Sequence, residues 1–250
     1  MKKIFIYISI VPSLLLASCE DYLDLKPEDV IESNHYWETA NASALEQYCN
    51  TFYPKLIIGQ GNPNTDGAIE FISKDCQSDN IYSTGANTIA WGQNLVSTSD
   101  GQWSWSIVRG CNEFLDNYMK SPAIESSKNQ YAGEIYFFKA MDYFNKVMRF
   151  GDVPWYTHPL STNSPELYKG RDSRYIVMDS ILMCLNNAIE LMPRKTNVSR
   201  VSKDAALALK ARVCLFEGTW RLYRDLEGSE KFLREAYNAA GELMKPEYGY

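Results

Sequence analysis

The chain has 250 residues, enough for one large domain or two small ones with a substantial hydrophobic core. Its net charge is −6 and no stretch concentrates Lys or Arg, so we expect no nucleic-acid partner, because binding phosphates requires a basic patch. Aromatic residues make up 13% of the chain, with 17 Tyr and 6 Trp. They serve either as the core of packed helices or, in part, as stacking platforms for sugar rings, and composition leaves both open.

The first segment, residues 1–18, is predicted to be a lipoprotein signal peptide. Two lysines precede an apolar run, Ile4 to Leu16, which is too short to span a membrane comfortably. The sequence Leu-Ala-Ser-Cys that ends at Cys19 resembles a bacterial lipobox, in which the Cys is lipidated and becomes the mature N-terminus. An ordinary signal peptide with a chance Cys is the alternative. Residues 19–27 are then a lipid-anchored tether, which attaches the protein to a membrane without spanning it.

Residues 37–53 are predicted to form the first helix, which Pro54 ends. Residues 55–101 are irregular and rich in Gly and Asn, and such long loops are often functional. Trp91 lies there beside three amide side chains, Asn87, Gln93 and Asn94. An aromatic face next to amides is what a sugar site requires, so these four residues are the candidate ligand-binding site. The alternative is that Trp91 only anchors its own loop.

Two helices joined by a short turn are predicted next, over residues 102–120 and 130–150, with Trp103 and Trp105 of the first interpreted as mainly core. In the second helix, the apolar side chains recur at three- and four-residue steps. Its polar residues are expected on the opposite face: Lys139, Asp142, Lys146 and Arg149. Gly151 is placed to end this helix in a left-handed conformation, and the prolines that follow predict a short extended run.

Three more helices are predicted over residues 174–192, 203–219 and 229–244, with Ser202 as the N-cap of the second. The helices thus come as hairpins, with the last one left without a partner. The fold class expected is all-α in the main, built of tetratricopeptide-like helical hairpins with long irregular loops, over a domain of residues 28–250.

No constellation for catalysis or metal binding emerges from the sequence. None of the six cysteines forms a C-x-x-C pair, the two histidines are far apart, and the motifs of hydrolases and nucleotide-binding enzymes are absent. We therefore expect no enzyme, no catalytic residue, no metal and no cofactor. Cysteines within helical patterns are expected to be buried free thiols. His158 is interpreted as capping a turn, with a pocket-lining position as the alternative.

Several segments resemble the SusD/RagB family of surface nutrient-binding lipoproteins of Bacteroidetes. The most specific match is an aromatic-rich helix followed by a Phe-Gly-Asp-Val-Pro turn. The matching residues are Phe138, Ala140, Tyr143, Phe144, Arg149 to Pro154, Pro159 and Leu160; Trp103, Ile107 and Asn112; Ser202, Lys203, Ala205, Ala206, Ala208, Leu209, Ala211, Arg212 and Leu215; and Cys19, Tyr22, Leu23, Asp24 and Pro27.

The resemblance implies a lipid-anchored outer-membrane protein that faces the cell exterior. Such a protein binds a glycan or other nutrient, an oligo- or polysaccharide, and delivers it to a SusC-like TonB-dependent transporter. Glu20 and Asp21, directly after Cys19, then resemble the export signal to the outer face. Family members are longer, so we expect residues 28–250 to be the N-terminal helical part of a truncated chain. Two alternatives stay open: a helical-repeat scaffold that binds only proteins, and a glycan hydrolase with two carboxylates.

Overall fold

The structure is a computed structural model that describes residues 33–57, 91–93, 101, 103–194 and 197–245. The chain divides into two units, Met1–Tyr36 and Trp37–Tyr250. Of the first unit only residues 33–36 are described, and they begin helix α2 (Ser33–Thr39). In the part of the chain that is described, no helix is long and apolar enough to cross a membrane.

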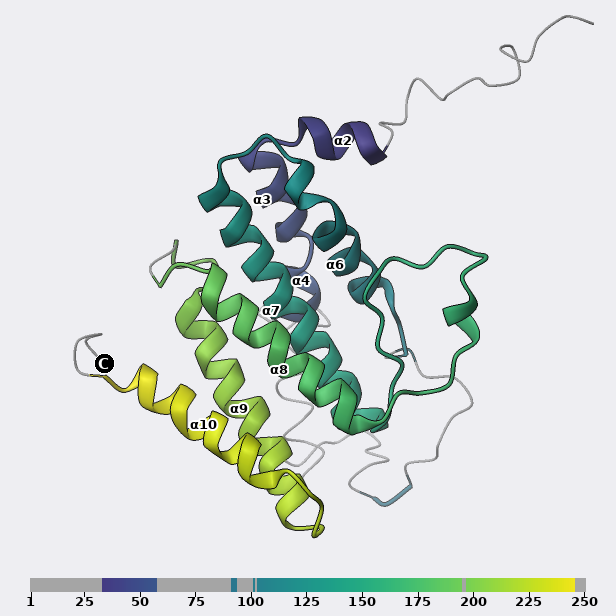
Figure 1. The fold of residues 1–250 in the computed structure, drawn as a ribbon, viewed down its shortest axis with the longest axis vertical. Helices are drawn as coiled ribbons and strands as arrows, with labels where there is room; N and C mark the ends of the chain where they lie inside the picture. The colour runs from purple at the N-terminus through teal and green to yellow at the C-terminus, as the bar shows by residue number, and fades with distance from the viewer. Residues whose placement is uncertain (1–32, 58–90, 94–100, 102, 195–196, 246–250) are drawn as a thin grey trace, which may run out of the picture. The chain divides into compact units, whose positions relative to one another are not determined.

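The second unit is built of helices, which Figure 1 shows with α7 at the centre. In chain order its elements are α3 (Ala42–Asn50), α4 (Tyr53–Leu56), α6 (Ser106–Asn117), the 3₁₀-helix η1 (Tyr118–Lys120), α7 (Glu125–Phe150), the 3₁₀-helix η2 (Pro165–Tyr168), α8 (Arg174–Leu191), α9 (Lys203–Leu222) and α10 (Ser229–Leu243). Within the described ranges no strand forms, and the β-type pairing is an isolated antiparallel bridge between Val153 and Asp172.

Neighbouring helices pack in consecutive pairs, as the hairpin prediction requires. Helix α6 packs on α7, α7 on α8, α8 on α9 and α9 on α10, while α3 lies against α7 (Figure 1). The expected fold class, mainly helical with tetratricopeptide-like hairpins, is therefore confirmed. One detail of the prediction is wrong: α10 is not left without a partner, because its apolar stripe with Phe232, Ala236 and Ala239 is buried.

The predicted helix boundaries are correct within about three residues for α8, α9 and α10. Ser202 caps α9 as expected, because its hydroxyl accepts a hydrogen bond from the Ala205 N–H at 3.4 Å. The single helix expected over residues 37–53 is wrong. The chain there breaks into separate helices, because Asn41 caps α3 through the Ala44 N–H, and Pro54 lies in the first turn of α4 instead of ending a helix.

The polar face expected on α7 is not a solvated face. Lys139, Asp142 and Lys146 are only 4–5% exposed, because α7 is surrounded by other helices and by the loop that follows it. The Lys146 ammonium pairs with the Asp142 carboxylate at 2.7 Å, one helical turn away. Only Arg149, of the four polar residues expected to face solvent, is exposed. Where neighbouring elements cover a helix on both sides, its charged residues must find partners within the protein.

The cysteines within helices follow the prediction. Cys111, Cys184 and Cys214, the three to which the prediction applied, are buried free thiols, and so is Cys49 of α3. Burial raises the pKa of the Cys184 thiol to about 11 and that of Cys214 to about 12, so both are protonated and unreactive at neutral pH.

Close packing of α9 on α10 depends on Gly218. A Cβ atom at this position would lie 2.7 Å from Leu233 Cδ2 and 3.0 Å from the Leu233 backbone N. We expect Gly218→Ala to lower the free energy of unfolding by about 1–3 kcal/mol, the usual cost of overpacking. Gly241→Ala on α10 is the matched control, because nothing lies within 4 Å of its added Cβ. Chemical denaturation measures both; equal stability of the two variants would show that α9 and α10 are not packed this closely.

Candidate functional site

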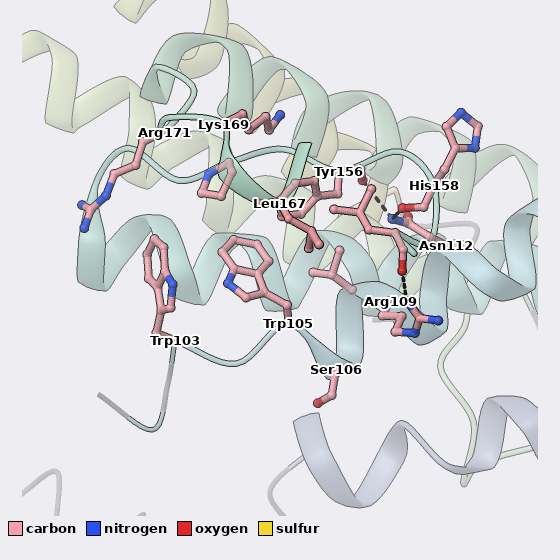
Figure 2. A pocket seen from close by; sticks show the side chains of 13 residues that line it. Trp103, Trp105, Ser106, Arg109, Asn112, Tyr156, His158, Leu167, Lys169 and Arg171 are labelled. Atoms are coloured by element: carbon pink, nitrogen blue, oxygen red, sulfur yellow. Dashed lines mark hydrogen bonds between the residues drawn. The ribbon is translucent and has the colours of Figure 1, made fainter. Parts of the chain in front are cut away.

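A pocket of about 590 Å³ opens between the start of α6 and the loop that joins α7 to α8. Its volume lies within the range of about 300–1,000 Å³ that is typical of ligand sites. Figure 2 shows the residues that line it: Trp103, Trp105, Ser106, Val108, Arg109, Asn112, Pro154, Tyr156, His158, Leu160, Leu167, Lys169 and Arg171.

The loop that forms one wall of the pocket is positioned by the Phe-Gly-Asp-Val-Pro turn. Gly151 ends α7 with a φ of 70°, a conformation that a residue with a Cβ adopts only under strain. The Asp152 carboxylate accepts a hydrogen bond from the Arg174 N–H at 2.8 Å and so caps α8 in place of a local side chain. Val153 is fully buried and bridges to Asp172. This turn therefore ties the end of α7 to the start of α8.

Hydrogen bonds with buried side chains hold the loop that forms this wall of the pocket. The Tyr156 N–H donates to the Tyr143 hydroxyl at 2.8 Å. The Asn112 amide of α6 donates to the carbonyl oxygens of Tyr156 and His158 at 3.1 and 3.2 Å, and accepts from the Lys139 ammonium of α7 at 2.6 Å. Burial raises the pKa of Tyr143 and lowers the pKa of Lys139. These contacts hold the pocket wall rigidly between α6 and α7.

Three half-buried aromatic rings line the pocket: Trp103 and Trp105 precede α6, and Tyr156 belongs to the loop after α7. The Trp103 and Trp105 rings meet edge to face at a centroid distance of 5.3 Å, and Trp105 meets Tyr156 in the same way at 5.3 Å. Trp103 packs against Phe150 at 4.9 Å, and Trp105 lies 6.0 Å from Tyr143. Both tryptophans thus pack against the core and line the pocket, so the interpretation of them as mainly core describes half of their role.

The rim of the pocket is polar and carries basic side chains. Arg109 donates to the Leu160 carbonyl, and Lys169 contacts the Trp155 carbonyl and the Asp172 carboxylate at 2.6 and 2.7 Å. Burial acts to raise the pKa of Asp172, but hydrogen bonds from Lys169 and the Trp155 N–H outweigh it and hold that pKa below its usual value. The Arg171 guanidinium lies 4.9 Å from the centre of the Trp103 ring, a cation–π contact.

His158 occupies the pocket-lining position, the alternative in the sequence interpretation. Its Nδ1 lies 2.9 Å from the Asp116 carboxylate, and its ring is largely exposed. Apolar rings beside several hydrogen-bond donors are suited to binding a sugar, whose C–H faces stack on aromatics while its hydroxyls accept hydrogen bonds. Among the described residues no group of three or more His, Cys, Asp or Glu side chains could hold a metal ion.

The structure describes two of the four predicted ligand-binding residues, Trp91 and Gln93. Trp91 is 59% exposed and Gln93 is exposed, and neither lines the pocket. Asn87 and Asn94, like Cys19, Glu20 and Asp21, lie outside the described residues. The predicted cluster around Trp91, the lipidation of Cys19 and the export signal therefore stay predictions.

Sequence reasoning missed Arg109, Lys169 and Arg171. They come from the start of α6 and from the end of the loop before α8, and no local pattern connects these two segments. The usable signal was the pair Trp103 and Trp105 just before a predicted helix, since two large rings so close together are difficult to bury completely.

Comparison with known proteins identifies the fold. A family model described as "Starch-binding associating with outer membrane" matches residues 21–215, most of the chain. The chain belongs to this SusD-like family. The resemblance stated from the sequence is therefore confirmed, and the family consists of binding proteins, not enzymes, as expected for this chain. Its description includes association with the outer membrane.

Individual relatives are similar to this chain over most of its length. SusD-like protein P38 of Formosa agariphila is 26% identical over 234 residues, which are 86% of this chain and 42% of the relative. A SusD-like carbohydrate binding protein from Bacteroides vulgatus has a TM-score of 0.62 at 17% identity, over 84% of this chain and 46% of the other. A laminarin binding SusD-like protein has a TM-score of 0.58 at 21% identity, over 81% and 42%. The chain thus spans less than half the length of these relatives.

Proposed function

We propose that this chain binds a glycan at the outer membrane and passes it to a TonB-dependent transporter. The observation that carries the binding half is the aromatic pocket, where Trp103, Trp105 and Tyr156 present ring surfaces beside basic and amide donors. The names of relatives that bind carbohydrate, one of them laminarin, support the same ligand class. The residues perform capture, not chemistry: the rings take the apolar faces of the sugar and the rim takes its oxygens.

The binding half is tested by titrating the chain with a panel of oligosaccharides that includes laminarin oligomers. For a bound member of the panel, we expect Trp105→Ala to weaken affinity about tenfold or more, because a central aromatic anchor contributes about 2 kcal/mol. Trp220→Ala is the matched control: Trp220 is also half-buried, but it lies on α9 outside the pocket. Isothermal titration calorimetry measures the affinities, and circular dichroism checks that both variants are folded.

Equal affinity of Trp105→Ala and Trp220→Ala would show that the pocket is not where the glycan binds. Trp91→Ala, titrated beside them, then tests the cluster predicted from the sequence. Binding that no tryptophan substitution weakens, or no binding by any panel member, would favour the alternative of a protein-interaction scaffold.

The transport half rests on the family description and on the predicted lipid anchor at Cys19. It is tested by gentle detergent extraction of the outer membrane and purification of the native protein with its partners. Recovery together with a large β-barrel transporter, in equal amounts, supports delivery to that transporter. Recovery from the soluble fraction, or without such a barrel, contradicts this half of the proposal.

A further inference from the structure

The charge of the pocket has one sign among the described residues. Its lining includes the basic side chains Arg109, Lys169 and Arg171, and no Asp or Glu. The chain as a whole carries the opposite charge, −6, with 31 acidic and 25 basic residues. A basic lining in an acidic protein is unexpected from composition, so it requires a local reason.

Two of these cations are not neutralised by a carboxylate within the described part of the chain. Lys169 pairs with Asp172, but the contacts of Arg109 and Arg171 are to backbone carbonyl oxygens, of Leu160 and Phe150 respectively. A guanidinium carries five N–H donors, so one hydrogen bond to a carbonyl leaves most of its donors available. Both arginines are exposed at the pocket rim.

The geometry favours a ligand with acidic groups attached to rings. The Arg171 guanidinium lies over the Trp103 ring, 4.9 Å from its centre, which places this cation beside an aromatic surface. Figure 2 shows Arg171 at the Trp103 end of the pocket and Arg109 at the opposite end. The N-terminal end of α6, with Ser106 as its first residue and no acidic residue in its first turn, adds positive potential to the same space.

We propose that the saccharide bound in this pocket is acidic, with carboxylate or sulfate groups held by Arg171 and Arg109 while its sugar rings contact the tryptophans. This inference rests on the proposed function and names the ligand class of the same site. Planar guanidinium groups bind carboxylates and sulfates through paired, charge-assisted hydrogen bonds, which are stronger than bonds to neutral hydroxyls.

The test compares ligands that differ only in charge. The whole chain is titrated with oligogalacturonides and with fully methyl-esterified oligomers of the same length, and with sulfated heparin oligosaccharides and their desulfated counterparts. We expect at least one acidic ligand to bind about tenfold or more tightly than its neutral counterpart, since a charge-assisted hydrogen bond contributes about that factor. The carboxylate and sulfate arms show which acidic group the pocket prefers. The affinity for the acidic ligand should fall as the salt concentration rises from 0.05 to 0.5 M, about the range over which exposed charges become screened.

Single substitutions of arginines test which side chains cause the preference for the acidic ligand. Arg171→Gln and Arg109→Gln should each remove most of the preference for the acidic ligand, whereas Arg212→Gln, an exposed arginine of α9 outside the pocket, should leave it unchanged. Equal affinity for every acidic ligand and its neutral counterpart, together with a loss of affinity in Trp105→Ala, would overturn the inference and leave the proposed function standing. Absence of binding by every neutral and acidic oligosaccharide would overturn both.

Discussion

Replacing Arg200 with Met is expected to destabilise the chain by about 3–5 kcal/mol, the usual cost of leaving a buried charge without its partner. The partner is Glu134 of α7, whose side chain is fully buried. Two bonds join them: Arg200 Nε to Glu134 Oε1 at 2.9 Å and Arg200 Nη2 to Glu134 Oε2 at 2.6 Å. The Tyr53 hydroxyl also donates to Glu134 at 3.0 Å. Met fills the volume of the aliphatic stem but provides no donor.

The same arginine joins parts of the chain that are far apart in sequence. Arg200 precedes α9, and its second terminal nitrogen contacts Glu46 and Asn50 of α3 at 2.9 and 2.8 Å. The Tyr53 hydroxyl accepts the Val201 N–H at 2.9 Å. Replacement of Arg200 therefore also weakens the packing of α3 and α4 on the other helices. Urea denaturation followed by circular dichroism measures the change in the free energy of unfolding.

A matched surface variant separates this effect from the general loss of an arginine. Arg234→Met removes an ion pair with Glu230 on α10, where both side chains are mostly exposed, so we expect a change of at most about 1 kcal/mol. The double variant Arg200→Met, Glu134→Met should be more stable than Arg200→Met alone, because it leaves no buried charge. Equal stability of Arg200→Met and Arg234→Met would contradict the assigned role of the buried pair.

The sequence predicts the helices well because helix formation is largely local. The three-residue and four-residue spacing of apolar side chains identified α7, α8, α9 and α10, and Ser202 marked the start of α9. Gly151 marked the end of α7, since the chain there needs a positive φ. These signals lie within one or two helical turns of the features that they predict.

The pocket forms through contacts between segments that are far apart in the sequence. The spacing of apolar residues along the chain does not predict such contacts. The spacing of Lys139, Asp142 and Lys146 indicated a solvated face, but packing of α7 inside the stack buried it. Arg109 and Arg171 are 62 positions apart in the sequence numbering and meet the same cavity only after α7 and α8 are joined by their loop. The family resemblance matched the turn that begins this loop but did not assign the loop to a ligand site, and the physical roles of its residues required the structure.

Asn112 is the residue through which the core and the pocket depend on each other, and Asn112→Leu is expected to reduce both stability and glycan binding. The side chain is fully buried and makes three hydrogen bonds, to Lys139 and to the carbonyls of Tyr156 and His158. Leu has a similar volume, so no large cavity forms, but the buried Lys139 ammonium loses its acceptor. We expect a loss of about 3 kcal/mol, the upper end of the range for an unsatisfied buried polar group.

A second substitution separates the two consequences. In Asn112→Leu, Lys139→Met the unpartnered ammonium is gone, so denaturation should show that most of the lost stability returns. Binding of the oligosaccharide should stay weak, because the Tyr156 and His158 carbonyls still lack the donor that holds the pocket wall against α6. Recovery of affinity together with stability would show that Asn112 only stabilises the core. Recovery of stability alone would show that this amide positions the wall on which the ligand is bound.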